Sequence, residues 1–203
     1  MKTGRRTRES DSTPTALASE HLSHLAIASV IYPVARMSRR RKVDFVPFDL
    51  LVVPSSCIDL TALLLRQNGQ AGQERLAIWA GTLVGTQGFV STILAPADGN
   101  GSGWVSPESS AKAHEALARR DLVPLAQLHS HPGRAYLSSI DRESPFFMCR
   151  GFLSVVVPNF GFVDMKNPRN WKVYRYESPR RWTELTPEEV ERSIIVDDAV
   201  IVE

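Results

Sequence analysis

The sequence predicts a mixed α/β or α+β domain, in which helices flank a mixed β-sheet. Segments rich in β-branched and aromatic residues are interspersed with segments of helical periodicity, and the two kinds do not alternate strictly. Hydrophobic residues make up 43% of the 203 residues and charged residues 23%, which is ordinary for a soluble globular protein. This length suits one domain with a full core. We therefore predict a domain over residues 43–203 that follows an arm over residues 1–42.

The arm over residues 1–42 is basic, and its first 20 residues show almost no hydrophobic periodicity. A short helix or strand is compatible with residues 21–37, where Pro33 interrupts the pattern. A basic arm can contact nucleic acid or an acidic partner, but a disordered or loosely structured tail is the simpler interpretation. The basic residues are Lys2, Arg5, Arg6, Arg8, Arg36, Arg39, Arg40, Arg41 and Lys42.

Nothing in the sequence predicts a membrane protein. The apolar run at residues 25–35 is shorter than the roughly 20 residues that span a bilayer, and it lies late for a signal peptide. Cys57 and Cys149 lack a paired metal spacing and have apolar neighbours, which predicts buried free thiols in a reducing compartment. We expect a cytoplasmic protein.

The domain begins with a predicted strand followed by a helix. The segment "VDFVPFDLLVVP" becomes apolar and ends at Pro54, as a strand entering a core would. For the helix, Ser56 is the expected cap, Asp59 the third helical residue and Gly69 the stop. The expected apolar face of this helix comprises Ile58, Leu60, Leu63 and Leu64.

Two further strands and a helix are predicted next. The segments "ERLAIWAGTLVG" and "GFVSTILAPA" have strand composition and are joined by a Thr-Gln-Gly turn. The segment "DGNGSG" at residues 98–103 predicts a flexible loop. Ser106, Pro107 and Glu108 have the order typical of a helix start, and the following Ala-rich stretch runs to Arg120.

The last part of the chain predicts three strands and a short helix. "LVPLAQLHSH" is a strand that Pro132 ends, "FLSVVVPNFG" is apolar enough for the centre of a sheet, and "WKVYRYE" alternates. Thr186 and Glu189 have the spacing of a capping box, so a final helix is expected.

His129 and His131 are candidate metal ligands. Residues i and i+2 of a strand face the same side, so both imidazoles point together, and Pro132 makes the chain leave the sheet directly afterwards. Asp141 follows ten positions later and can return a carboxylate through a loop or a helix start. Two histidines, one carboxylate and an open position are typical of a catalytic zinc site. Each residue alone has an ordinary interpretation, a hydrogen-bonded histidine or a helix-capping aspartate, but the combination favours a metal.

The motif His129-Ser130-His131-Pro132, followed by Ser138-Ser139-Ile140-Asp141, resembles the JAMM signature of the JAB1/MPN/Mov34 metalloenzymes. That family also requires a glutamate on an early strand, and Glu74 matches it, with Gly81 at the expected distance. The chain departs from the pattern in two ways. Five residues instead of six separate the proline from the serine, which could move Asp141 or transfer the serine's role to Ser139. Ala77 and Trp79 replace the common Gly and Leu.

This resemblance implies a fold, a metal and a role for each residue. The implied fold is the JAB/MPN (cytidine-deaminase-like) fold, a curved mixed sheet flanked by helices. The implied zinc ligands are His129, His131 and Asp141. Glu74 would be the base that takes a proton from the attacking water and protonates the leaving amine, and Ser138 would stabilise the oxyanion. Amide hydrolysis needs such an activated water, a proton shuttle and a polarised carbonyl.

The resemblance further implies a zinc isopeptidase or peptidase that cleaves the amide bond after the C-terminus of a ubiquitin-like modifier, by deconjugation or precursor processing. The compact chain looks like a bacterial stand-alone, deubiquitinase-like member. Its implied partners are the modifier, its conjugates and E1-like and E2-like proteins of one operon, in some cases an antiphage operon.

Several alternatives stay open at this point. The substrate could be a sulfur-carrier protein or a small amide, or the domain could be a metal-free scaffold. A nucleic-acid-associated relative is a third alternative, which the absence of a DNA-binding motif disfavours. Arg134 and Tyr136 are placed either to line the substrate cleft or to serve as plain loop residues.

Overall fold

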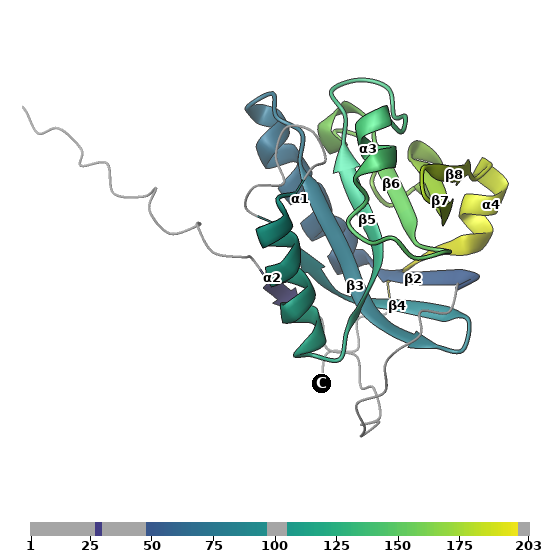
Figure 1. The fold of residues 1–203 in the computed structure, drawn as a ribbon. Helices are drawn as coiled ribbons and strands as arrows, with labels where there is room; N and C mark the ends of the chain where they lie inside the picture. Colours follow the sequence, from purple (N-terminus) through teal and green to yellow (C-terminus); the bar gives the residue numbers. More distant parts are fainter. Residues whose placement is uncertain (1–26, 30–47, 97–104, 199–203) are drawn as a thin grey trace, which may run out of the picture.

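The computed structural model describes residues 27–29, 48–96 and 105–198, which form one nine-stranded sheet (Figure 1). The strand order is β8-β7-β6-β5-β3-β4-β2-β9, and β1 pairs with β4. The β2–β4, β2–β9 and β5–β6 pairs are parallel and the others antiparallel, which confirms the predicted mixed sheet. The strands are β1 (Ile27–Ser29), β2 (Leu50–Pro54), β3 (Leu76–Val84), β4 (Gln87–Leu94), β5 (Val123–Ser130), β6 (Leu153–Val157), β7 (Lys172–Ser178), β8 (Arg181–Glu184) and β9 (Ile194–Asp197).

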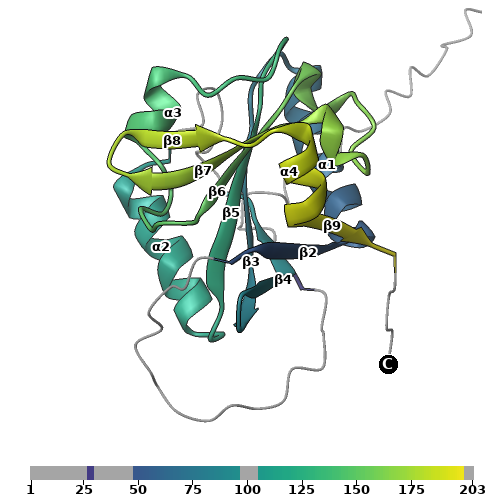
Figure 2. The same ribbon diagram turned by 90° about the vertical axis from the view of Figure 1, so that its right-hand side faces the viewer.

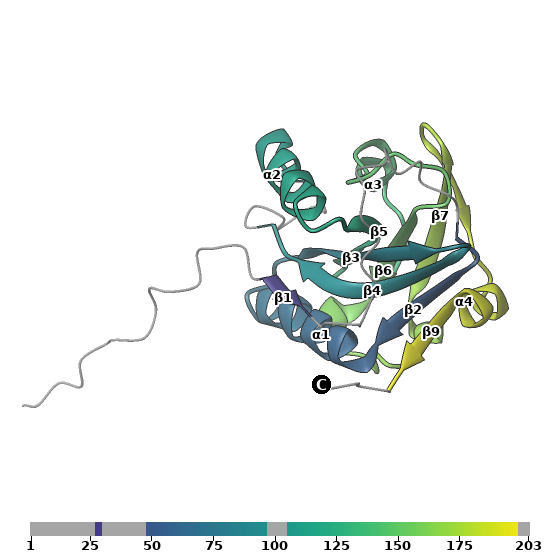
Figure 3. The ribbon, with the colours of Figure 1, turned by 90° about the horizontal axis from the view of Figure 1, so that it is seen from below.

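Helices cover both faces of the sheet, as Figures 2 and 3 show. Helices α1 and α4 pack on one face, and α2 and α3 lie on the other. Their bounds are α1 (Ser55–Gln70), α2 (Pro107–Ala118), α3 (Ser139–Glu143) and α4 (Pro187–Ser193), with 3-10 turns at η1 (Asn159–Gly161) and η2 (Pro168–Asn170). None of the helices in the described part of the chain has the length and apolar character that crossing a membrane requires.

The largest core lies between the sheet and the face covered by α1 and α4. Trp79 of β3 is fully buried there, and its Nε1 donates to Thr61 Oγ1 of α1 at 2.9 Å. Strand β6 lies between β5 and β7 and is buried along its whole length, so its predicted central position is confirmed. The helix starts at Ser106 and Thr186 are also confirmed, since each hydroxyl accepts a backbone N–H of its helix. Strands β8 and β9 are additional to the prediction.

Helix α1 differs from the prediction at both ends. The helix begins directly after Pro54, so Ser56 lies in the first turn and no side chain caps it. Gly69 lies inside the helix, which continues to Gln70. A Cβ at Gly69 would lie 2.2 Å from Phe160 Cβ, so this glycine serves a close packing contact instead of a helix stop. Leu63, expected on the apolar face, is 52% exposed.

Strands β3 and β4 match their predictions except at the turn. Gly85 and Thr86 form the two-residue turn between paired Val84 and Gln87, and Gly85 has a positive φ of 59°. Gly81 lies where the pairing register shifts, and a Cβ there would come within 1.8 Å of the Phe89 carbonyl oxygen. Only glycine fits this irregularity.

Several predictions concern residues outside the described ranges. The arm over residues 1–42 is described only at β1, and the loop at residues 98–103 lies outside as well, so the domain boundaries stay predictions. Of the two thiols, Cys57 is buried as expected, whereas Cys149 is only half-buried.

Candidate metal centre

The end of strand β5 brings the two histidines together. His129 pairs with Leu76 of β3 on one side and with Val156 of β6 on the other. His131 follows the last strand residue, and its N–H donates to the Val157 carbonyl at 2.8 Å. The two ring centroids are 5.1 Å apart, and the side chains are 1% and 5% exposed. The spacing of two residues along the strand therefore places both rings on one face, as predicted.

Asp141 returns to the histidines on helix α3. The helix begins with a capping box: the Ser138 N–H donates to Asp141 Oδ2 at 2.8 Å, and the Asp141 N–H donates to Ser138 Oγ at 3.2 Å. Asp141 is only 5% exposed. The capping box orients the buried carboxylate, so capping a helix and facing the two histidines are compatible in this geometry.

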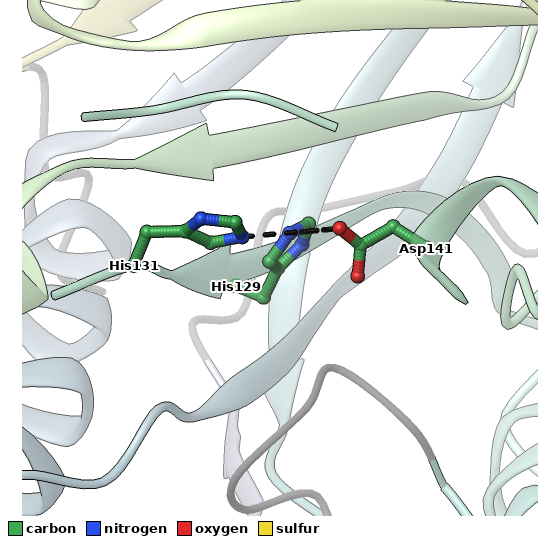
Figure 4. Close-up of side chains that lie close together, drawn as sticks. All are labelled: His129, His131 and Asp141. Atoms are coloured by element: carbon green, nitrogen blue, oxygen red, sulfur yellow. Dashed lines mark ion pairs between the residues drawn. The ribbon is translucent and has the colours of Figure 1, made fainter. Parts of the chain in front are cut away.

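The three side chains converge at a single point (Figure 4). Asp141 Oδ2 lies 3.3 Å from His129 Nε2 and 3.8 Å from His131 Nε2. One ligand atom from each residue lies within 4.8 Å of the other two, and among the described residues this is the one such cluster of three. The loop at residues 133–137, one residue shorter than usual in the family it resembles, still returns Asp141 to both imidazoles.

The cluster fits a zinc ion. Tetrahedral zinc with nitrogen and oxygen ligands at about 2.0–2.1 Å separates those ligands by about 3.3 Å, close to the spacing seen here. Both ring nitrogens of His129 are buried and make no hydrogen bond, although Nε2 faces Asp141. Buried nitrogens without partners are costly, and a bound cation would satisfy one of them.

The electrostatics of Asp141 favour its charged form. Burial raises the pKa of its carboxyl, but the two facing imidazoles and Ser138 outweigh burial and hold that pKa well below its usual range. The carboxylate is therefore ionised at neutral pH, as a metal ligand must be.

Glu74 lies beside the cluster but not in it. It precedes Leu76 by two residues, and Leu76 pairs with His129, so in an extended chain the Glu74 side chain shares the face of the histidines. Burial raises the pKa of Glu74, whereas the charges of His131 and His129 lower it and the charge of Asp141 raises it. The half-buried carboxyl thus belongs to the face of the sheet that carries His129.

The two serines of the motif have different surroundings. The Ser138 hydroxyl accepts the Asp141 N–H and keeps its own hydrogen for donation. Ser139 is exposed in the first turn of α3. Tyr136 is 55% exposed and packs edge-on against the His131 ring, with centroids 4.6 Å apart, whereas Arg134 is exposed.

The sequence did not predict a role for Gln127 or for Ser130, the two other polar residues at the end of β5. Gln127 and Ser130 are buried, and both make hydrogen bonds to segments that carry the carboxylates. The available signal was the presence of polar side chains in an otherwise apolar strand, "LAQLHS".

Comparisons with known proteins agree with this geometry. A protein described as "Probable metalloprotease y4jG", from Sinorhizobium fredii, is 30% identical over 155 residues, which cover 72% of this chain and 93% of that protein. The solution structure of protein DSY2949 from Desulfitobacterium hafniense shares the fold, with a TM-score of 0.54 and 15% identity over 75% of this chain and 96% of that chain.

A more distant likeness exists to AF2198, a JAB1/MPN domain protein from Archaeoglobus fulgidus. Its TM-score is 0.39, with 15% identity over 73% of this chain and 98% of that chain, which is too loose to carry weight. No protein-family model matches the chain.

Proposed function

This chain belongs to the family of JAB/MPN-domain metalloproteases, and from that premise we propose that it is a zinc-dependent peptidase acting on ubiquitin-like modifiers. The hydrolysed bond is the amide after the C-terminus of the modifier, either in a conjugate or in a precursor. The observation that carries the proposal is the buried cluster of His129, His131 and Asp141, with Glu74 beside it.

Each residue has a distinct part in the chemistry. A zinc ion held by His129, His131 and Asp141 would lower the pKa of a water molecule to about 7, so that the water can attack a carbonyl at neutral pH. With zinc bound, Glu74 would accept a proton from the attacking water on its carboxylate and pass it to the leaving amine. The Ser138 hydroxyl donates a hydrogen bond to the oxygen on which negative charge develops.

Exposed apolar side chains support a protein substrate over a small amide. In the segment around α3, Tyr136 is 55%, Ile140 53% and Met148 71% exposed, and Ile140 directly precedes the Asp141 ligand. Tyr136 packs against the His131 ring, so exposed apolar surface adjoins the cluster, which favours binding of a protein partner there.

The finer assignment follows from the resemblance of the motif. We propose a deubiquitinase-like enzyme of the cytoplasm that works with E1-like and E2-like proteins of one operon, either a ubiquitin-like conjugation operon or an antiphage operon. A neighbouring gene for a ubiquitin-like protein would support this assignment, whereas a neighbouring sulfur-carrier gene would favour that substrate instead.

Cleavage of a linear fusion between a ubiquitin-like modifier and a reporter protein tests the proposal. The zinc-loaded protein should cleave the fusion after the modifier's C-terminus, and a chelator should stop cleavage until zinc is restored. Glu74→Gln should keep the zinc and lower kcat by at least about 100-fold, since it removes the base. Purified protein that binds no zinc would identify a metal-free scaffold, and full activity of Glu74→Gln would show that another group is the base.

A further inference from the structure

We propose that Gln127 and Ser130, the buried polar residues of β5 other than the histidines, position the two carboxylates of the centre. Gln127 positions Asp141, and Ser130 positions Glu74. This inference rests on the proposed metal centre and assigns the two residues no contact with the metal or the substrate.

The first observation is that α3 has little packing of its own. The helix has five residues, and Asp141 is its one buried residue. Ile140 is 53% exposed, and the other members face solvent fully or in part. A helix of a single turn without an apolar face has no stability in isolation. Direct contacts with the sheet are few: Trp182 Nε1 of β8 donates to the Arg142 carbonyl at 3.4 Å, and the Arg142 guanidinium lies over the Tyr174 ring of β7. We therefore infer that the segments on either side of α3 contribute to its position.

Those segments are anchored in the core. Before α3, Leu137 is buried in a cluster with Phe152 and Val156. After α3, Phe146 is buried in a second cluster with Leu76 and Ile78 of β3 among its members. Asp141 thus lies between two segments that are packed in the core, one at Leu137 and one at Phe146. The Phe146 segment contributes to where the C-terminal end of the helix lies.

Gln127 connects the Phe146 segment to β5 by a hydrogen bond. Its Oε1 accepts the Phe146 N–H at 2.8 Å, and its Nε2 donates to Ser154 Oγ of β6 at 3.1 Å. The amide orientation is fixed by chemistry, because a backbone N–H can only donate. Gln127 is 3% exposed and precedes His129 by two residues, on the same face of the strand. One side chain thereby sets the distance between the strand that holds the histidines and the segment that holds Asp141.

Ser130 makes the corresponding link to Glu74. Its N–H donates to the Arg75 carbonyl at 3.2 Å, and its Oγ accepts the Arg75 N–H at 3.1 Å. In a regular antiparallel pair the carbonyl of Ser130 would accept that N–H. The hydroxyl substitutes for the carbonyl at the last residue of β5.

The consequence is that two hydrogen bonds join Ser130 to Arg75, the residue that follows Glu74. Without the Ser130 hydroxyl, the Arg75 N–H would lose this bond, and the start of β3 could separate from β5. Glu74 lies at that start, outside the regular strand, so its position depends on the hydrogen bonds of Arg75, and the Ser130 hydroxyl accepts one of them.

Metal affinity tests the role of Gln127. Gln127→Met keeps the unbranched shape but removes both bonds, and zinc should bind at least about 10-fold more weakly, the usual effect of losing an outer support of a ligand. The visible spectrum of bound Co²⁺ should change as well. Ser154→Ala is the matched control, because it removes the Nε2 partner and leaves the Phe146 bond, so zinc affinity should stay within about 2-fold. Gln127→Asn, which stays polar but is too short to reach Phe146, serves if the methionine variant does not fold.

Hydrogen exchange and kinetics test the role of Ser130. In Ser130→Ala the Arg75 amide, followed by NMR, should exchange about 10-fold faster or more. The variant should bind zinc normally, and kcat should fall about 10- to 100-fold with KM little changed, because a displaced base affects the chemical step. Ser130→Thr keeps the hydroxyl and should restore the amide protection and kcat.

The two variants control for one another. If Gln127 and Ser130 only stabilised the fold, Gln127→Met and Ser130→Ala would each lower zinc affinity and kcat together. Zinc binding of Gln127→Met and Gln127→Asn at the affinity of the unaltered protein would overturn the role of Gln127. Unchanged exchange of Arg75 in Ser130→Ala would overturn the role of Ser130. If the unaltered protein bound no zinc, the proposed function itself would fail. That result is distinguishable from the two results that would overturn the roles of Gln127 and Ser130.

Discussion

Helices α3 and α4 begin with the same local structure, but the acids in their first turns have different roles. In α3, Ser138 and Asp141 form a capping box with N–H to oxygen distances of 2.8 and 3.2 Å. In α4, Thr186 and Glu189 form one with distances of 2.7 and 3.3 Å. Each box orients an acid in the first turn of a short helix. By their backbone hydrogen bonds alone the two helix starts cannot be told apart.

The surroundings of the two acids differ. Asp141 is buried and faces His129 and His131, which with Ser138 hold its pKa low despite burial. Glu189 is half-exposed and lines a shallow pocket together with Arg175 and Arg192. A capping box thus supplies an oriented carboxylate, and the neighbouring strand decides whether that carboxylate becomes a metal ligand.

The largest expected effect comes from removing the charge of the buried acid. Asp141→Asn keeps an oxygen that can accept the Ser138 N–H, so α3 should form, but zinc affinity should fall by about 1000-fold or more because a ligand is lost. Competition with a chromophoric chelator measures the affinity, and circular dichroism checks the fold. Zinc binding at unaltered strength would show that Asp141 is only a capping residue, as Glu189 is.

Removing the two capping hydroxyls should separate stability from catalysis. Ser138→Ala and Thr186→Ala should each lower the free energy of unfolding by about 1 kcal/mol, since each removes an N-cap. Only Ser138→Ala should also lower kcat, by about 100-fold, through loss of the oxyanion donor. Urea unfolding and fusion cleavage measure the two effects. Equal kcat values in both variants would assign the oxyanion role elsewhere, with Ser139 the next candidate.

The next variant replaces the aspartate of the α3 capping box by glutamate, the acid in the α4 capping box. Asp141→Glu can still form the capping box, as Thr186 and Glu189 do, but the added methylene displaces the carboxylate from the histidines. Zinc affinity should fall about 10-fold, since ligand geometry matters even when charge is kept. If calorimetry with zinc shows no change, α3 must shift to compensate, which its weak packing would permit.

The smallest effect is expected at α4. Glu189→Gln keeps an acceptor for the Thr186 N–H and removes one charge near the helix N-terminus, which should cost about 0.3–1 kcal/mol in the free energy of unfolding. Zinc affinity and cleavage should equal those of the unaltered protein. A loss of zinc in this variant would mean that charge remote from the cluster governs binding, contrary to the comparison above.

Much of the fold could be predicted because it depends on local patterns. Strand β6 is a short apolar run, and the hydroxyl caps of α2 and α4 act within three residues of the helix start. The ends of α1 could not be predicted in this way. A glycine at position 69 is typical of a helix C-terminus, but here it allows close contact with Phe160, which lies 91 positions away along the chain. Such a contact leaves no local pattern.

The same distinction between local patterns and long-range contacts applies to the candidate site. The sequence by itself determined that His129 and His131 share a face and that Pro132 ends their strand, because each depends on covalent geometry over a few residues. It left open whether Asp141 returns through a loop or through a helix start.

Only the tertiary structure decided that these pieces meet. The pairing register of β3 with β5 places Glu74 beside His129, and the burial of Phe146 against Gln127 holds α3 over the same strand. Register and burial arise from the whole sheet and its core, since they are set by contacts between segments far apart in the chain. The candidate ligands can therefore be recognised from short segments of the sequence. Their convergence into one centre depends on contacts between distant segments of the fold.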